Sequence, residues 1–99
     1  MVTLLIEHAV TDLATWRAAF DRFAQARARA GVLAHRISQP VEDAAYVLVE
    51  LDFADAERAQ RFLAFLTENV WSSPANAPAL VGSPRTRTVN VVESWSQPA

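Results

Sequence analysis

The stretch from Val2 to Gly31, VTLLIEHAVTDLATWRAAFDRFAQARARAG, decides the fold because it combines a strand with a helix whose two ends are marked. Residues 2–9 are aliphatic and lack Gly and Pro, which is typical of a buried strand. Asp12 is a natural N-cap and Gly31 a natural C-terminal residue, so the sequence predicts a helix over 12–30. One apolar stripe at helical spacing follows this helix, made of Leu13, Trp16, Phe20 and Phe23.

The rest of the chain contains four further segments with clear patterns. Residues 32–38 and 45–53 alternate and predict two strands, and Asp55 caps a second helix over about 56–69. After a long connection with three prolines, residues 86–93 predict a fourth strand. This order of elements, βαββαβ, is that of the ferredoxin-like α+β sandwich, in which two helices cover one face of a four-stranded antiparallel sheet.

Length and composition fit one domain and exclude several classes of protein. The 99 residues predict a single domain over 1–99, with 94–99 as a loose tail. A net charge of −2, with no basic and aromatic motif, argues against nucleic-acid binding. No apolar run reaches the ~20 residues of a membrane span and no signal peptide is recognisable, so we expect a cytoplasmic protein. Without cysteine, and with two histidines on non-adjacent strands, we expect no metal and no cofactor.

The two faces of the predicted sheet differ in what covers them. Both crossovers are right-handed, so both helices lie on one face and leave the other bare. The residues expected under the helices include Leu4, Ile6, Leu33, Ile37, Val47, Val49, Leu51, Phe53, Val89 and Val91. Those expected on the bare face are Thr3, Leu5, Tyr46, Leu48, Thr88, Asn90 and Val92. That mix is too apolar for water, so we expect a homodimer packed through the bare face, with a monomer as the alternative.

The same alternation brings residues from four segments to one mouth between helices and sheet. His8 and Arg87 are expected to face the helices where the end of strand one meets the start of strand four. Trp16 lies in the second turn of the first helix, and Trp71 follows the second helix. An apolar cleft with a few converging polar groups suits a small apolar or aromatic ligand. His35 faces the same way on an edge strand, as a further substrate-binding candidate or as an exposed edge residue.

Each candidate has a functional and a structural interpretation. His8 titrates near neutrality, which suits acid–base catalysis, but a histidine at a strand end also bonds backbone carbonyls. Arg87 could hold an anionic or phenolate oxygen, or pair with a surface carboxylate. Trp16 belongs to a packing stripe. Packing does not obviously require a tryptophan at Trp71, between a helix and prolines, so Trp71 is the more informative of the two.

The segment His8–Trp16, with the pattern His-x-Val-x-Asp-x-x-x-Trp, resembles dimeric α+β barrel proteins of the antibiotic-biosynthesis-monooxygenase type. The likeness covers most of the chain through Phe20, Asp21, Gly31, Leu51-Asp52-Phe53 and Gly82-x-Pro84. It implies a dimeric barrel and, among relatives, cofactor-independent oxygenases of aromatic polyketides, quinol oxygenases and haem-degrading enzymes. The resemblance implies that Trp71 could correspond to the tryptophan that lines the helix–sheet cavity in enzymes of this group. The chain lacks the Asn of the group on strand one and a His after Trp71, which argues against haem cleavage.

Two hypotheses of different classes follow. The first is a cofactor-independent monooxygenase or cyclase-like enzyme acting on an aromatic or polyketide-type molecule, with His8, Trp71 and Arg87 as catalytic residues. In it, His8 accepts or relays the proton of an activated phenol and Arg87 steadies the anion, which reacts with dioxygen. The second is a non-catalytic dimeric module that binds a small apolar molecule or only itself.

Overall fold

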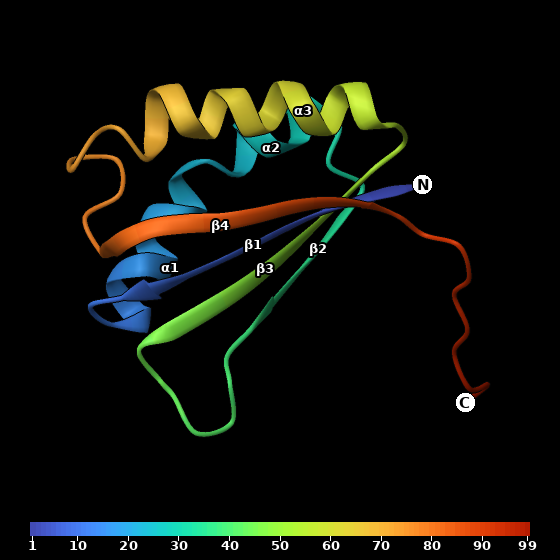
Figure 1. Ribbon diagram of the computed structural model, residues 1–99, viewed down its shortest axis with the longest axis horizontal. Helices are drawn as coiled ribbons and strands as arrows, with labels where there is room; N and C mark the ends of the chain where they lie inside the picture. Colours follow the sequence, from blue (N-terminus) through green and yellow to red (C-terminus); the bar gives the residue numbers. More distant parts are fainter.

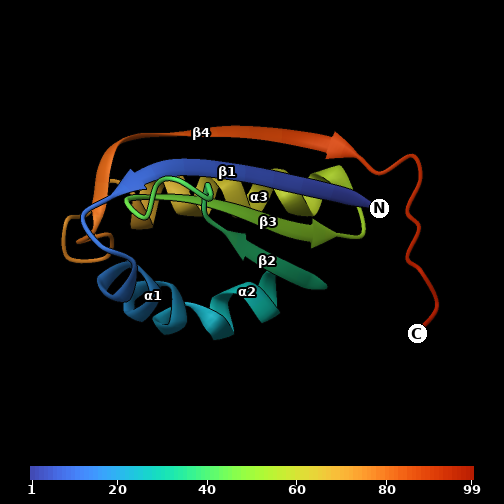
Figure 2. The same ribbon diagram turned by 90° about the horizontal axis from the view of Figure 1, so that it is seen from below.

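The computed structural model describes residues 1–99 and confirms the ferredoxin-like α+β fold (Figure 1). Its elements are β1 (Val2–Val10), α1 (Leu13–Arg22), α2 (Ala24–Ala30), β2 (Ala34–Ser38), β3 (Tyr46–Phe53), α3 (Ala56–Phe65), the π-helix η1 (Leu66–Val70) and β4 (Leu80–Asn90). The sheet order is β2-β3-β1-β4, and all neighbouring strands are antiparallel. The helices lie on one side of the sheet and leave its other face uncovered (Figure 2). None of the helices combines the length and apolar character that a membrane crossing requires.

The predicted helix over 12–30 is divided into α1 and α2 at Phe23. Both of its predicted ends are confirmed. The carboxylate of Asp12 accepts a hydrogen bond of 2.7 Å from a backbone N–H in the first turn, and Gly31 has a left-handed φ of 90°. At the break, the N–H of Phe23 donates to the carbonyl of Phe20, only three residues back, at 3.1 Å. This tighter turn ends α1 and redirects the chain into α2.

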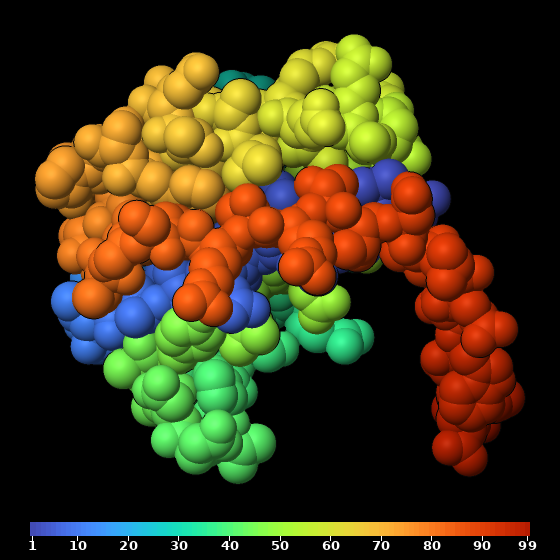
Figure 3. Space-filling model, viewed as in Figure 1, coloured from blue at the N-terminus to red at the C-terminus, as the bar shows by residue number.

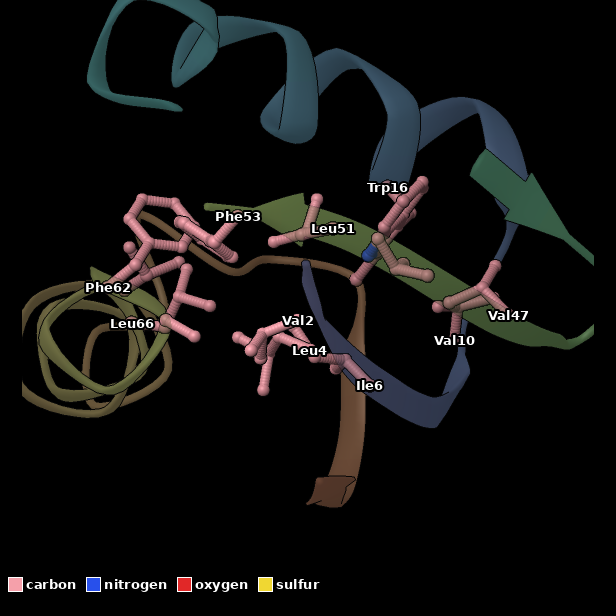
Figure 4. Packing of buried hydrophobic residues seen from close by; sticks show 14 residues of the cluster. Val2, Leu4, Ile6, Val10, Trp16, Val47, Leu51, Phe53, Phe62 and Leu66 are labelled. Atoms are coloured by element: carbon pink, nitrogen blue, oxygen red, sulfur yellow. The ribbon is translucent and has the colours of Figure 1, made fainter. Parts of the chain in front are cut away.

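The core fills the space between the sheet and the helices. The central strands β1 and β3 supply its most buried side chains, such as Leu4 and its strand partner Leu51. From α3, Phe62 packs on Phe53 with ring centres 6.0 Å apart. Figure 4 shows this packing, with Trp16 reaching from α1 toward β3. Full burial of a Leu or Phe side chain contributes about 1.5–3 kcal/mol, so these contacts hold the two layers together.

Two residues expected in the core lie elsewhere. Val89 pairs with Thr3 and therefore faces the uncovered side of the sheet. Thr88 pairs with the core residue Leu4 and faces the helix side, where it is exposed. β4 is an edge strand at the rim of the helix layer, so its helix side needs no apolar residues. Leu33 precedes β2 and is 64% exposed, so its expected burial was also wrong.

The uncovered face carries apolar and charged residues side by side. Its members include Leu5, Glu7, Leu48, Glu50 and Asp52 on the central strands and Arg36, Arg85, Arg87 and Val89 on the edge strands. Two hydrogen bonds order the centre, from the Tyr46 hydroxyl to Glu7 at 2.8 Å and from the Thr3 hydroxyl to Asp52 at 2.6 Å. The β2–β3 loop and the exposed residues 94–99 project on this side and leave a hollow between them (Figures 1 and 3).

Candidate functional site

An apolar cavity lies between the sheet and the helices. Its walls come from β1 and β3 on the sheet side, from α1 and α2, and from α3, η1 and the loop that follows η1. The space inside that the centre of a water molecule can reach is about 70 Å³. Three polar side chains line it, His8, Arg27 and Asn76, and all other lining residues are hydrophobic. A mostly apolar cavity with a few polar groups is the usual form of a small-molecule site.

His8 points from β1 toward the helices, as the strand alternation predicts, and is 5% exposed. Its Nδ1 donates a hydrogen bond of 2.9 Å to the carbonyl of Ala9, so the neutral ring carries its lone pair on Nε2. Nε2 has no hydrogen-bond partner, and no fully buried side-chain nitrogen or oxygen lacks one, so Nε2 is accessible on a side chain that lines the cavity. Burial lowers the pKa of His8, and the Ala9 hydrogen bond opposes this shift. A neutral ring with a free nitrogen is suited to act as a general base.

Two tryptophans line the cavity from different helices. The buried Trp16 of α1 has its ring centre 6.3 Å from that of His8 and stacks on Phe20 at 4.9 Å. Trp71 follows η1, and its backbone N–H donates a hydrogen bond of 2.8 Å to the carbonyl of Leu66, five residues back. A π-helical turn contains an additional residue, so it changes the direction in which Trp71 projects, and such turns are frequent at functional sites. Both tryptophans thus contribute aromatic surface to the cavity lining.

The other two predicted site residues lie outside the cavity. His35 faces the helix side of β2 and meets the edge of Phe20 at 5.3 Å between ring centres, but it is exposed and does not line the cavity. Arg87, expected beside His8, pairs with Leu5 and faces the uncovered side of the sheet. The predicted position of Arg87 was wrong because the apolar Val89 was assumed to point toward the helices. Val89 in fact lies on the uncovered face, and Arg87 lies on the same face.

Arg27 is a site residue that the sequence did not reveal. It is 7% exposed, its Nη1 donates to the carbonyl of Phe20 at 2.6 Å, and its Cζ lies 3.6 Å from the centre of the Phe20 ring. Burial lowers the pKa of Arg27, while the charge of Asp21 acts in the opposite direction. A signal was present, because Arg27 follows Phe23 by four residues and continues the stripe that faces the core.

Asn76 is the second lining residue that sequence reasoning missed. It lies in the loop between η1 and β4, and its amide nitrogen donates to the carbonyl of Asn69 at 2.7 Å. Loop positions have no periodic pattern, so nothing in the sequence pointed to it. No three His, Asp or Glu side chains gather closely enough to hold a metal ion. The groups of this site can hold a planar ring, accept a proton and stabilise a negatively charged oxygen.

Comparison with known proteins agrees with this fold. No family model matches the chain, and no curated protein matches it. SnoaB from Streptomyces nogalater, a cofactor-independent oxygenase, matches over 97% of each chain with 17% identity and a TM-score of 0.72. A candidate antibiotic biosynthesis monooxygenase from Deinococcus radiodurans matches over 100% of each chain with 14% identity and a TM-score of 0.71.

A third structure of the same kind is a dimeric ferredoxin-like protein from an uncultured marine organism. The match covers 98% of this chain and 100% of the other, with 13% identity and a TM-score of 0.70. All three identities are low, so the likeness resides in the arrangement of helices and strands. The chain therefore shares with these three structures the ferredoxin-like α+β fold that its sequence predicted.

Proposed function

We propose that the chain is a cofactor-independent monooxygenase that acts on a compact aromatic molecule, such as a phenol or a polyketide-type ring, in the helix–sheet cavity. The observation that carries this proposal is the neutral imidazole of His8, which has no partner at Nε2 and lines the same cavity as Trp16 and Trp71. The resemblance of the sequence supports it, and so does the shared fold of SnoaB, described as a cofactor-independent oxygenase.

The proposed reaction uses the imidazole as a base. The ring of the substrate packs between Trp16 and Trp71, and Nε2 of His8 takes a proton from an acidic carbon whose anion is delocalised into the phenol. The carbanion donates one electron to dioxygen, and the resulting radicals join in a carbon–oxygen bond. The peroxide takes the proton back from His8. Loss of the second hydrogen from the same carbon breaks the O–O bond, so that a CH₂ group and O₂ become a carbonyl group and water.

A non-catalytic binding module is the second candidate, and the size of the cavity favours it. About 70 Å³ of reachable space leaves little room for a large polycycle in the present arrangement of side chains. The hydrogen bond from His8 to Ala9 is also a sufficient structural use of that histidine. On this alternative, the chain binds a small apolar molecule or only a second copy of itself.

The proposal includes a homodimer formed through the uncovered face of the sheet. Half-buried apolar side chains adjoin charged ones there, and the ion pairs within the chain, Arg58–Asp55 and Arg61–Glu57, lie at the first turns of α3 instead. Acidic residues on the central strands and arginines on the edge strands allow two copies to pair opposite charges across the interface. The marine protein with the same fold, described as dimeric, supports this assembly.

The test of the proposed activity is turnover of anthrones, which carry the CH₂ group that the reaction requires, under isotopically labelled dioxygen, followed by mass spectrometry of the product. We expect one labelled oxygen atom in the product and the other in water. Trp95→Phe serves as a matched control, because Trp95 is 77% exposed and lies outside the cavity. Turnover that survives the combined change His8→Ala and Trp71→Ala contradicts the assignment of the site, and binding without turnover favours the second candidate.

A further inference from the structure

The guanidinium of Arg27 is buried and forms no ion pair, and the only carboxylate whose charge acts on it is that of Asp21, which is not within ion-pair distance. Arg27 is 7% exposed, and neither of the chain's ion pairs, Arg58–Asp55 and Arg61–Glu57, includes it. A charge taken out of water is unfavourable unless an opposite charge or several hydrogen bonds compensate it. The hydrogen bond to Phe20 and the contact with its ring compensate part of this penalty. Arg27 is therefore held where an anion would stabilise it.

The structural use of Arg27 leaves most of its donors free. A guanidinium has five N–H donors, and one hydrogen bond, to the carbonyl of Phe20 at the α1–α2 break, is formed. No fully buried side-chain nitrogen lacks a partner, so the remaining donors of Arg27 are accessible. Arg27 also lines the cavity, which brings its side chain within reach of a ligand there. A neutral amide would suffice to close the helix break, whereas a guanidinium also fits the two oxygens of a carboxylate.

We propose that Arg27 anchors a negatively charged oxygen carried by the aromatic ligand of this cavity, so that the preferred ligands are aromatic acids. The inference rests on the proposed use of the cavity as a ligand site and adds the chemical class of that ligand. The Phe20 ring lies against both the guanidinium and the indole of Trp16, so the anchor is continuous with aromatic side chains that line the cavity.

The positions of Arg27 and His8 assign different parts of the ligand to the two groups. The guanidinium of Arg27 lies against the ring of Phe20. That ring contacts His35 of β2, which is paired with Leu51 of β3. His8 is paired with Val47, four residues from Leu51 and roughly 13 Å away along the strand at a rise of about 3.3 Å per residue. The anchored oxygen is therefore distinct from the atom that gives its proton to His8.

The test compares two ligands with the same ring system, 2-naphthoate and methyl 2-naphthoate, by titration calorimetry. The wild-type protein should bind the acid about tenfold or more tightly than the ester, because only the acid forms charge-assisted hydrogen bonds. Arg27→Met should remove this preference and leave the affinity for the ester within about twofold. Arg27→Lys keeps the charge without the planar fork and should retain part of the preference. Arg29→Met, at an exposed arginine of the same helix, should behave as wild type.

The outcomes separate this inference from the proposed function. Equal binding of acid and ester by the wild-type protein, or a preference that persists in Arg27→Met, overturns the anchor and leaves the cavity as a ligand site. Failure of both compounds to bind overturns the cavity as a site for aromatic ligands, and the anchor with it. If Arg27→Met does not fold, the wild-type comparison of acid and ester, together with Arg27→Lys, decides the question.

Discussion

The imidazole of His8 lies 6.3 Å from the indole of Trp16, measured between ring centres, with the two planes tilted by 57°. The indole belongs to the apolar surface that separates the imidazole from bulk water. Burial of this kind disfavours the charged ring and lowers the pKa of His8. The same contact thus makes the histidine neutral at physiological pH and places it in a cavity, which is the combination that a general base requires.

This burial makes stability depend on pH in a defined direction. The pKa of His8 in the folded chain lies below its ordinary value of 6.5, so the unfolded chain binds more protons as the pH falls through that range. The free energy of unfolding should therefore decrease below pH 6.5 and level off once the folded histidine is also protonated. Urea denaturation across this range should show a weaker dependence in His8→Gln. His35→Gln, which changes an exposed histidine, should keep the wild-type dependence, and equal slopes in all three proteins would disprove this assignment.

Ligand binding should be visible in the fluorescence of the cavity tryptophans. Trp16 and Trp71 line the cavity, whereas Trp95 is 77% exposed in the tail. In a Trp95→Phe background, 2-naphthol should quench the remaining emission in a saturable manner. Replacing Trp71 by Phe in that background should remove a large part of the quenching. Saturable quenching that requires Trp95 and no other tryptophan would place the ligand outside the cavity.

Two leucines of the chain should differ sharply in their contribution to stability. Leu4 is fully buried on β1, so Leu4→Ala should lower the free energy of unfolding by about 2–5 kcal/mol through lost packing and a residual cavity. Leu33 is 64% exposed before β2, so Leu33→Ala should change it by no more than about 0.5 kcal/mol. Chemical denaturation of both variants measures this difference. Similar losses for both would mean that β2 is packed differently from the structure described.

The proposed dimer should dissociate when a charge is added at the centre of the uncovered face. Leu48 lies on β3 beside Glu7, so Leu48→Glu places like charges together in an interface that excludes water. Sedimentation equilibrium should report a dimer for the wild-type chain and a monomer for this variant. Gln60→Glu, which adds the same charge at an exposed position of α3 on the other side of the sheet, should remain dimeric. A monomeric wild-type chain would remove the dimer from the proposal.

Elements with strong local signals could be predicted from the sequence. Asp12 and Gly31 mark the ends of a helical segment by hydrogen bonding and by left-handed backbone geometry, and both act as expected. The alternation in β3 is equally clear, because its inward residues are buried by two neighbouring strands and the helices. The resulting order of elements, together with right-handed crossovers, leaves few possible folds, and the ferredoxin-like arrangement is confirmed.

The candidate site was harder to predict because it depends on tertiary contacts. His8 faces the helices as the alternation of a central strand requires, but the facing of Arg87 could not be read from β4. An edge strand is less completely covered by the helices than a central strand. An apolar residue on it, such as Val89, therefore does not show which face points toward the helices. Arg27 continues the stripe of Phe23, but arginine is rarely buried, so its position alone did not identify it as a site residue.

Oxygen uptake with an anthrone that the protein turns over, measured from acidic to neutral pH in wild-type protein and in His8→Gln, tests the proposed role of His8 most directly. The wild-type rate should fall as the pH decreases through the lowered pKa of His8, because the protonated ring cannot accept a proton. His8→Gln should lower the rate by about 10²–10⁴-fold without this acidic limb, while anthrone binding stays within about twofold. Equal rates and equal pH profiles in the two proteins would show that the imidazole in this cavity is not the base.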